Sequence, residues 1–314
     1  MTAAVVLVRR FRRPLRALLI GIALVLCFAV IVDRRHEVDS ALHQLDPGIV
    51  VVAFIPVIVG TVMMMLSWRV LLADLGSPLP ISSSTRVFFL AQLGKYIPGS
   101  VWPLLAQVEL GREHGVPGRR SGVVGIVAMV VGLLAGLLVA AVTLPLFSPN
   151  ATQHYWWLFL AVPLLLAGLH PRLFNPLLAR IFRLARREPP DTLLTARGLI
   201  RSLAWSIAGW AGYGLQVWLL VRDLGGTDRS ALPLAIGSFA LAWAVGFVIV
   251  IAPAGAGARE AALVIGLAPI LKPGAALLVA LISRMLLTAA DLLLALTAAV
   301  SARRHKRAAA TPAG

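Results

Sequence analysis

Long apolar segments recur along this chain, and they constrain its fold more than any other feature. Runs of about 18 or more apolar residues predict membrane spans. Hydrophobic residues make up 59% of the chain and charged residues only 13%, too little polar surface for a water-soluble domain of this size. The sequence therefore predicts an all-α polytopic membrane protein, a single integral membrane domain over 1–314. The six predicted full spans are 16–32, 49–72, 121–147, 155–169, 199–221 and 274–300.

Two further apolar regions, 86–111 and 231–271, are broken in the middle, which predicts hairpins rather than single spans. The first contains "GKYIPGSVWP", with a break at Pro98 and Gly99. Its entering limb has 12 residues, so as a helix it is roughly 18 Å long and crosses only about half of the hydrocarbon core. This limb is expected to enter, turn and return to the same side.

The second broken region contains "PAGAGARE", in which Pro253, Gly255 and Gly257 interrupt the helix. Its first limb, 231–251, is long enough to cross the membrane. Both a re-entrant hairpin and a full crossing followed by a stretched return therefore remain open for this region. Non-helical backbone at membrane depth is tolerated only inside protein or along a wet cavity.

The basic residues indicate the orientation. If the N-terminus is cytoplasmic, 21 Lys and Arg residues fall on the cytoplasmic side and 5 on the other. This bias follows the positive-inside rule and places both termini, the basic loop 170–201 and the tail 301–314 in the cytoplasm. Because the charge of +16 is distributed in this way, nucleic-acid binding is not expected. One cysteine and scattered histidines predict no disulfide, metal centre or cofactor.

The order of segments predicts an inverted repeat. Residues 1–150 and 155–300 each contain two spans, a broken hairpin and a further span. An odd number of crossings precedes the second unit, so the two would have opposite orientations. Inverted repeats with broken helices are typical of membrane transporters.

Charged residues inside the apolar regions are the candidate functional groups. Helix N-termini at the breaks carry partial positive charge, which suits a phosphate ligand. The predicted lipid-phosphate-binding residues are Lys95, Arg259, Arg284, Ser100 and Tyr96. The possible proton-coupling acids are Glu260, Asp291 and Glu109. Three acids match three cations, so internal pairing is the alternative, for example between Arg284 and Asp291 on one helix face.

The motifs "AQLGKYIPGSVW" and "PAGAGAREAAL" resemble the lysylphosphatidylglycerol synthase transmembrane-region family, also called flippase-like. This is the membrane half of the bacterial multiple peptide resistance factor, and the resemblance covers roughly 50–300. It implies a polytopic protein that moves or handles anionic or isoprenoid-phosphate lipids. The aminoacyl-lipid synthases of the family carry a soluble catalytic domain after the spans. The present sequence ends at Gly314, so aminoacylation is not expected of it.

The function expected from these features is a flippase-like transporter of the cytoplasmic membrane, with membrane lipids as its partners. No G-x-x-x-x-G-K-[ST] motif for ATP and no catalytic grouping is visible, so an enzyme is not expected. One alternative is an ion-coupled carrier of a small anion. Another is an accessory subunit that binds a lipid-modifying enzyme or glycosyltransferase.

Overall fold

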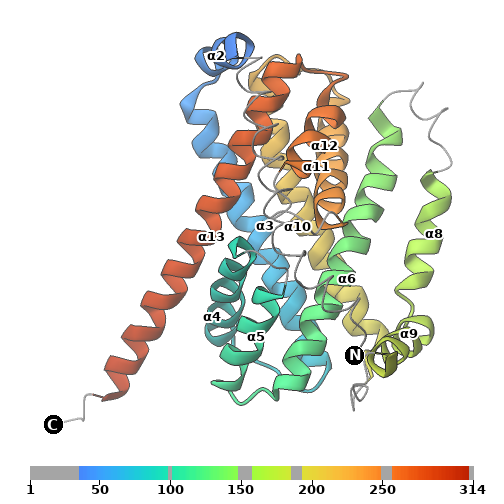
Figure 1. Ribbon diagram of the computed structural model, residues 1–314, viewed down its shortest axis with the longest axis vertical. Coiled ribbons are helices and arrows are strands. Elements are labelled where there is room, and N and C mark those ends of the chain that lie inside the picture. Colours follow the sequence, from blue (N-terminus) through green and yellow to red (C-terminus); the bar gives the residue numbers. More distant parts are fainter. Residues whose placement is uncertain (1–34, 98–100, 148–157, 185–192, 249–256, 311–314) are drawn as a thin grey trace, which may run out of the picture.

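The protein is an elongated helical bundle (Figure 1). The structure, a computed structural model, describes residues 35–97, 101–147, 158–184, 193–248 and 257–310, and every regular element within these ranges is a helix. The first elements are α2 (Arg35–Gln44), α3 (Pro47–Asp74), α4 (Ile81–Gln92), η1 (Leu93–Tyr96), α5 (Trp102–Arg112), α6 (Gly118–Thr143) and η2 (Pro145–Phe147). The others are α8 (Leu158–Gly168), α9 (Pro171–Leu184), α10 (Ala196–Asp223), α11 (Ala231–Val248), α12 (Ala258–Leu267) and α13 (Pro273–Ala310).

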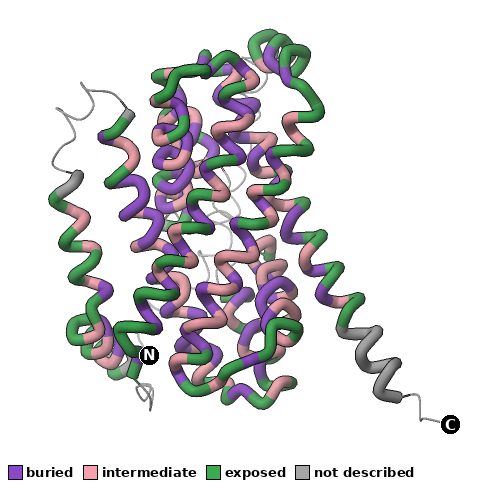
Figure 2. Tube along the Cα trace, turned by 180° about the vertical axis from the view of Figure 1, so that it is seen from behind, coloured by how far each residue is buried: buried purple, intermediate pink, exposed green. Residues whose placement is uncertain are grey.

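Three of the described helices, α3, α6 and α13, are long and apolar enough to cross a membrane. Large apolar side chains are exposed on the outer surface, among them Val51, Leu164 and Ile265. Figure 2 shows buried residues where helices face one another and exposed residues on the outer sides. In water such a surface would drive association, whereas in a bilayer it faces lipid. The all-helical, polytopic membrane class predicted from the sequence agrees with this architecture.

Helix α10 is as long as α3, 28 residues, but less apolar, and it buries several polar groups inside the bundle. The hydroxyl of Ser67 on α3 lies 2.7 Å from that of Ser202 and 2.9 Å from that of Ser206. Gln216 donates to Ser283 at 2.7 Å. Polar groups buried among helices are satisfied by one another when water is absent, so these contacts join α10 to α3 and α13.

Small residues allow α3 and α10 to pack closely. A Cβ atom added to Gly60 would lie 2.9 Å from the carbonyl oxygen of Gly209, and one added to Gly212 would lie 2.8 Å from that of Pro56. On the other side of α10, Trp210 is buried and its indole nitrogen donates to the carbonyl of Gly132 on α6 at 3.0 Å. Helix α10 therefore lies at the centre of the bundle.

The two broken regions form hairpins in opposite halves of the molecule (Figure 1). The first hairpin consists of α4, η1 and α5, and the second consists of α11 and α12, which pack side by side. Helix α13 runs along both halves and contacts α4 in one and α12 in the other. The long limb of the second hairpin, which the sequence left open, is an 18-residue helix in the same half as α12.

One segment differs from the sequence expectation. The predicted basic loop 170–201 contains α9, whose Phe174 and Leu178 are buried while Leu173 and Leu177 are exposed. Its apolar residues recur at helical spacing, a signal that the charge count concealed. Of the predicted span 155–169, the structure describes residues 158–169, including α8 with 11 residues. The predicted span 16–32 lies outside the described residues.

Candidate functional site

In the first hairpin, α4 is followed directly by a short 3₁₀ helix, η1, which carries two polar side chains. In η1, a Cβ atom on Gly94 would lie 2.7 Å from the backbone nitrogen of Pro103, so only glycine fits against the start of α5. Lys95 and Tyr96 follow directly and are half-buried. The ammonium of Lys95 lies 5.5 Å from the centre of the Tyr96 ring. The η1 turn thus places the two side chains next to each other.

Asp291 on α13 accepts hydrogen bonds from both of these side chains. The Lys95 Nζ and the Tyr96 hydroxyl each lie 2.6 Å from the same atom, Asp291 Oδ2. The Asp291 side chain is only 4% exposed, whereas that of Lys95 is 33% exposed. Because hydrogen bonds to an ionised group are strong, this contact holds α13 against the first hairpin.

The second hairpin is joined to α13 by a second ion pair. The Oε1 atom of Glu260 on α12 accepts a hydrogen bond from the guanidinium of Arg284. Its other oxygen, Oε2, accepts from the backbone nitrogen of Gly257 at 2.6 Å and caps the start of α12. Gly257 has a φ of +87°, a left-handed conformation that favours glycine. Glu260 therefore fixes both its own helix and α13.

Arg284 and Asp291, two turns apart on α13, thus bind different hairpins. The sequence suggested that these two residues form an ion pair with each other. Instead, Arg284 binds the acid of the second hairpin and Asp291 binds the base of the first. Helix α13 consequently connects the two hairpins through one cation and one anion.

Arg259 differs from the other two cations. Within the described part of the chain it forms no ion pair, and its guanidinium lies 4.7 Å from the centre of the Phe239 ring. A cation over an aromatic face is attracted by the ring quadrupole. The charge of Arg259 also interacts with those of Glu260, Arg284 and Asp291. Arg259 thus adds one positive charge to the cluster of two ion pairs, which we call the α13 charge cluster: Lys95, Tyr96, Arg259, Glu260, Arg284 and Asp291.

Most of the predicted site residues that the structure describes meet in this cluster. Glu109 does not. It lies on the exposed outer surface of α5, 3.4 Å from Arg112, because it belongs to the far end of that limb. The remaining predicted residues, Pro98, Gly99, Ser100, Pro253 and Gly255, lie outside the described residues.

Sequence reasoning missed Tyr213 on α10. Its hydroxyl donates to Thr61 on α3 at 3.2 Å, and it interacts electrostatically with Asp291 and Arg259. A tyrosine in the middle of a predicted span was the available signal, since only three tyrosines occur in the chain. Among the described residues, no group of three acidic, histidine or cysteine side chains is placed to hold a metal ion.

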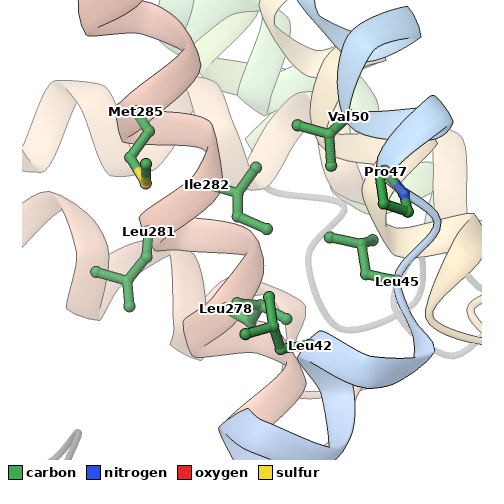
Figure 3. A pocket seen from close by; sticks show the side chains of 8 residues that line it. All are labelled: Leu42, Leu45, Pro47, Val50, Leu278, Leu281, Ile282 and Met285. Atoms are coloured by element: carbon green, nitrogen blue, oxygen red, sulfur yellow. The ribbon is translucent and has the colours of Figure 1, made fainter.

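A separate groove of about 470 Å³ lies between α2, the start of α3 and α13 (Figure 3). Its walls are apolar, with Leu42 and Pro47 on one side and Leu278, Ile282 and Met285 on the other. No charged side chain lines it, so the groove is not part of the α13 charge cluster.

Comparison with known proteins agrees with the motif resemblance. Residues 15–295 match the family described as the lysylphosphatidylglycerol synthase TM region. No curated protein matches the sequence. The family match covers most of the chain and includes both hairpins and α13 as far as residue 295. The chain therefore belongs to the lysylphosphatidylglycerol synthase transmembrane-region family, a membrane protein family linked to lipid biology.

Proposed function

We propose that this protein is a flippase-like transporter of an anionic phospholipid or an isoprenoid-phosphate lipid. The phosphate would bind near Lys95, Arg259 and Arg284, and the hydrocarbon tail would stay in the bilayer. The observation that carries the proposal is Arg259, a cation in the middle of the bundle that forms no ion pair with any described carboxylate. Charged residues at membrane depth are costly and mark substrate pathways.

The charge balance of the cluster supports an anionic ligand. Three cations face two carboxylates, which leaves one positive charge without a counter-ion among the described residues. The start of α12 adds the partial positive charge of a helix N-terminus. A phosphate group supplies the negative charge that this arrangement lacks.

The arrangement of the hairpins supports alternating access. The two hairpins lie in opposite halves of the molecule, as inverted repeats would, and α13 contacts both. In transporters built this way, one repeat rocks against the other around a site near the midplane. The basic bias of the sequence predicts that α9 and the C-terminal end of α13 face the cytoplasmic side of the cell membrane.

A reconstituted-vesicle assay tests the proposal. The full chain is incorporated into vesicles with a head-labelled phosphatidylglycerol or isoprenyl phosphate, and the label exposed on each face is followed over time. The wild type should equilibrate the lipid, and Arg259→Ala should reduce the rate by about tenfold or more, since a charge-assisted contact contributes at least 1.5 kcal/mol. Arg222→Ala is the matched control, because Arg222 contacts the Trp218 ring outside the cluster.

The same vesicles separate the alternatives. Uptake of soluble phosphate without lipid movement would indicate a carrier of small anions. Absence of both, with a glycosyltransferase or other lipid-modifying enzyme co-purifying, would indicate an accessory subunit. A folded Arg259→Ala protein with the wild-type rate of lipid movement would show that the headgroup does not bind there.

A further inference from the structure

The two donors of η1 converge on a single oxygen atom. Lys95 supplies an ammonium and Tyr96 a hydroxyl, and both lie 2.6 Å from Asp291 Oδ2. An ammonium and a hydroxyl aimed at one oxygen atom can donate to a phosphate oxygen in the same way as they donate to a carboxylate oxygen. The two donors of η1 are therefore placed to bind an oxyanion, and in this structure the carboxylate of Asp291 lies between them.

The two carboxylates of the cluster are held in different ways. Glu260 caps the start of its own helix through Gly257, three residues away, in addition to binding Arg284. Asp291 has no such local contact among the described residues. It reaches across 195 sequence positions to Tyr96, and the two donors of η1 are the groups it binds within the described part of the chain. Moving the Asp291 carboxylate would therefore break no described contact at a helix start, whereas moving that of Glu260 would break the cap of α12.

We propose that Asp291 is an internal substitute for the ligand's oxyanion: its carboxylate occupies the Lys95 and Tyr96 donors, and a phosphate group binds them by displacing it. This inference rests on the proposed function, since it concerns the same cations. The proposal also defines the chemistry of the ligand group: an oxyanion that accepts hydrogen bonds from an ammonium and a phenol hydroxyl together. It also makes Asp291 the residue that sets the affinity of the site.

Physical reasons favour such an exchange. A cation at membrane depth is costly without a counter-ion, so Lys95 requires an anion whether or not ligand is present. Asp291 supplies it in the unliganded protein. The side chains of Lys95 and Arg284 are each about one-third exposed, 33% and 32%, so an incoming anion can reach them. Arg259, which forms no ion pair among the described residues, can hold that anion while the carboxylate departs.

Binding measurements on the full chain test this inference. The purified protein in neutral detergent is titrated separately with inorganic phosphate and with short-chain phosphatidylglycerol, and short-chain phosphatidylcholine serves as the zwitterionic control. Asp291→Asn keeps the size of the side chain and removes its charge, so the ligand no longer competes with it. We expect Kd for at least one of the two anions to fall by about tenfold, within the usual range of coupling between two binding events.

Two further variants distinguish displacement from a general gain in positive charge. Glu260→Gln changes the net charge by the same amount as Asp291→Asn, but the Asp291 carboxylate still occupies the Lys95 and Tyr96 donors. Its gain in affinity for the anion should therefore be smaller than that of Asp291→Asn. Tyr96→Phe changes no charge, yet it removes one donor to the shared oxygen. Introduced into the Asp291→Asn protein, it should raise Kd again. Each variant is compared at equal monodispersity in gel filtration, and Asp291→Ser replaces Asp291→Asn if the latter does not yield folded protein.

The outcomes separate this inference from the proposed function. If the wild type binds an anion and neither Asp291 variant binds it more tightly, displacement is wrong and the headgroup site remains. An equal gain from Glu260→Gln, with no effect of Tyr96→Phe, would also overturn displacement. If neither the wild type nor any variant binds either anion better than phosphatidylcholine, both proposals fail. Tighter binding of phosphatidylglycerol alone would identify a lipid headgroup as the ligand, and tighter binding of phosphate alone a soluble anion.

Discussion

At the scale of single residues, the environment of each charge decides what it contributes. The Asp291 side chain is almost completely buried and depends on Lys95 for its counter-ion. Arg86 and Glu113, at the hairpin end away from the tip, form a pair of the same type at 2.8 Å, but their side chains are 20% and 47% exposed. Exposed ion pairs contribute little because water and salt screen them, whereas a buried charge that loses its partner is strongly destabilising.

These two pairs give a matched prediction. Lys95→Gln should lower the free energy of unfolding by roughly 3 kcal/mol, because it leaves the Asp291 carboxylate without a cation inside the bundle. Glu113→Gln should lower it by less than about 1 kcal/mol. Thermal unfolding of the purified proteins in detergent measures both effects. Equal losses would contradict the burial argument, and adding Asp291→Asn to Lys95→Gln should recover part of the stability.

At the scale of elements, close packing of α3 and α10 orders the centre of the bundle. The contact depends on glycines that bring the two backbones together, as Gly60 and Gly209 do. Without a hydrophobic effect between helices in lipid, such packing and buried hydrogen bonds supply the association. The charge cluster depends on it indirectly, because Tyr213 lies in the same interface and interacts with Asp291.

Glycine substitutions test this packing. Gly60→Ala should destabilise the protein by about 1–3 kcal/mol, because its Cβ would lie 2.9 Å from the Gly209 oxygen and 3.0 Å from the Tyr213 ring. Gly132→Ala on α6 is the control: apart from its chain neighbours and the backbone of its own helix, no described atom lies within 4 Å of its added Cβ. It should leave stability unchanged or raise it slightly, since alanine favours helix. Melting temperatures in one detergent compare the two variants, and a Gly60→Ala protein as stable as the wild type would refute close packing at this site.

At the scale of the whole molecule, the hairpins enter from opposite ends. The first begins beside the turn after α3, and the second begins beside the turn after α10. Figure 1 places these turns at opposite ends of the bundle. The basic residues predict that the end with α9 faces the cytoplasm.

Cysteine labelling in intact cells tests this arrangement. In a Cys27→Ser background, Ser82→Cys lies on the exposed start of α4 and Thr227→Cys in the exposed turn before α11. A membrane-impermeant maleimide should label Thr227→Cys in intact cells and Ser82→Cys only after the membrane is opened. Labelling of both sites from one side would refute the opposed hairpins and, with them, the inverted repeat.

The sequence by itself determined the class of the protein and much of its outline. Apolar segment length predicted α3, α6 and α13 as spans, and the Pro-Gly breaks predicted where the two hairpins turn back. These features depend on local composition, because lipid solvates apolar helices whatever their neighbours are. The same local signals selected Lys95, Arg259 and Arg284 as unusual cations at membrane depth.

Only the tertiary structure decided which charges meet. Asp291 binds Lys95 rather than Arg284 on its own helix, and Glu109 faces away from the cluster on the outer surface. Partner choice depends on how each helix is rotated and how deeply it sits against its neighbours. Those quantities follow from packing over nearly 200 residues, which no local pattern encodes. The pairing of Asp291 with both Lys95 and Tyr96, on which the displacement proposal rests, therefore became visible only in the folded chain.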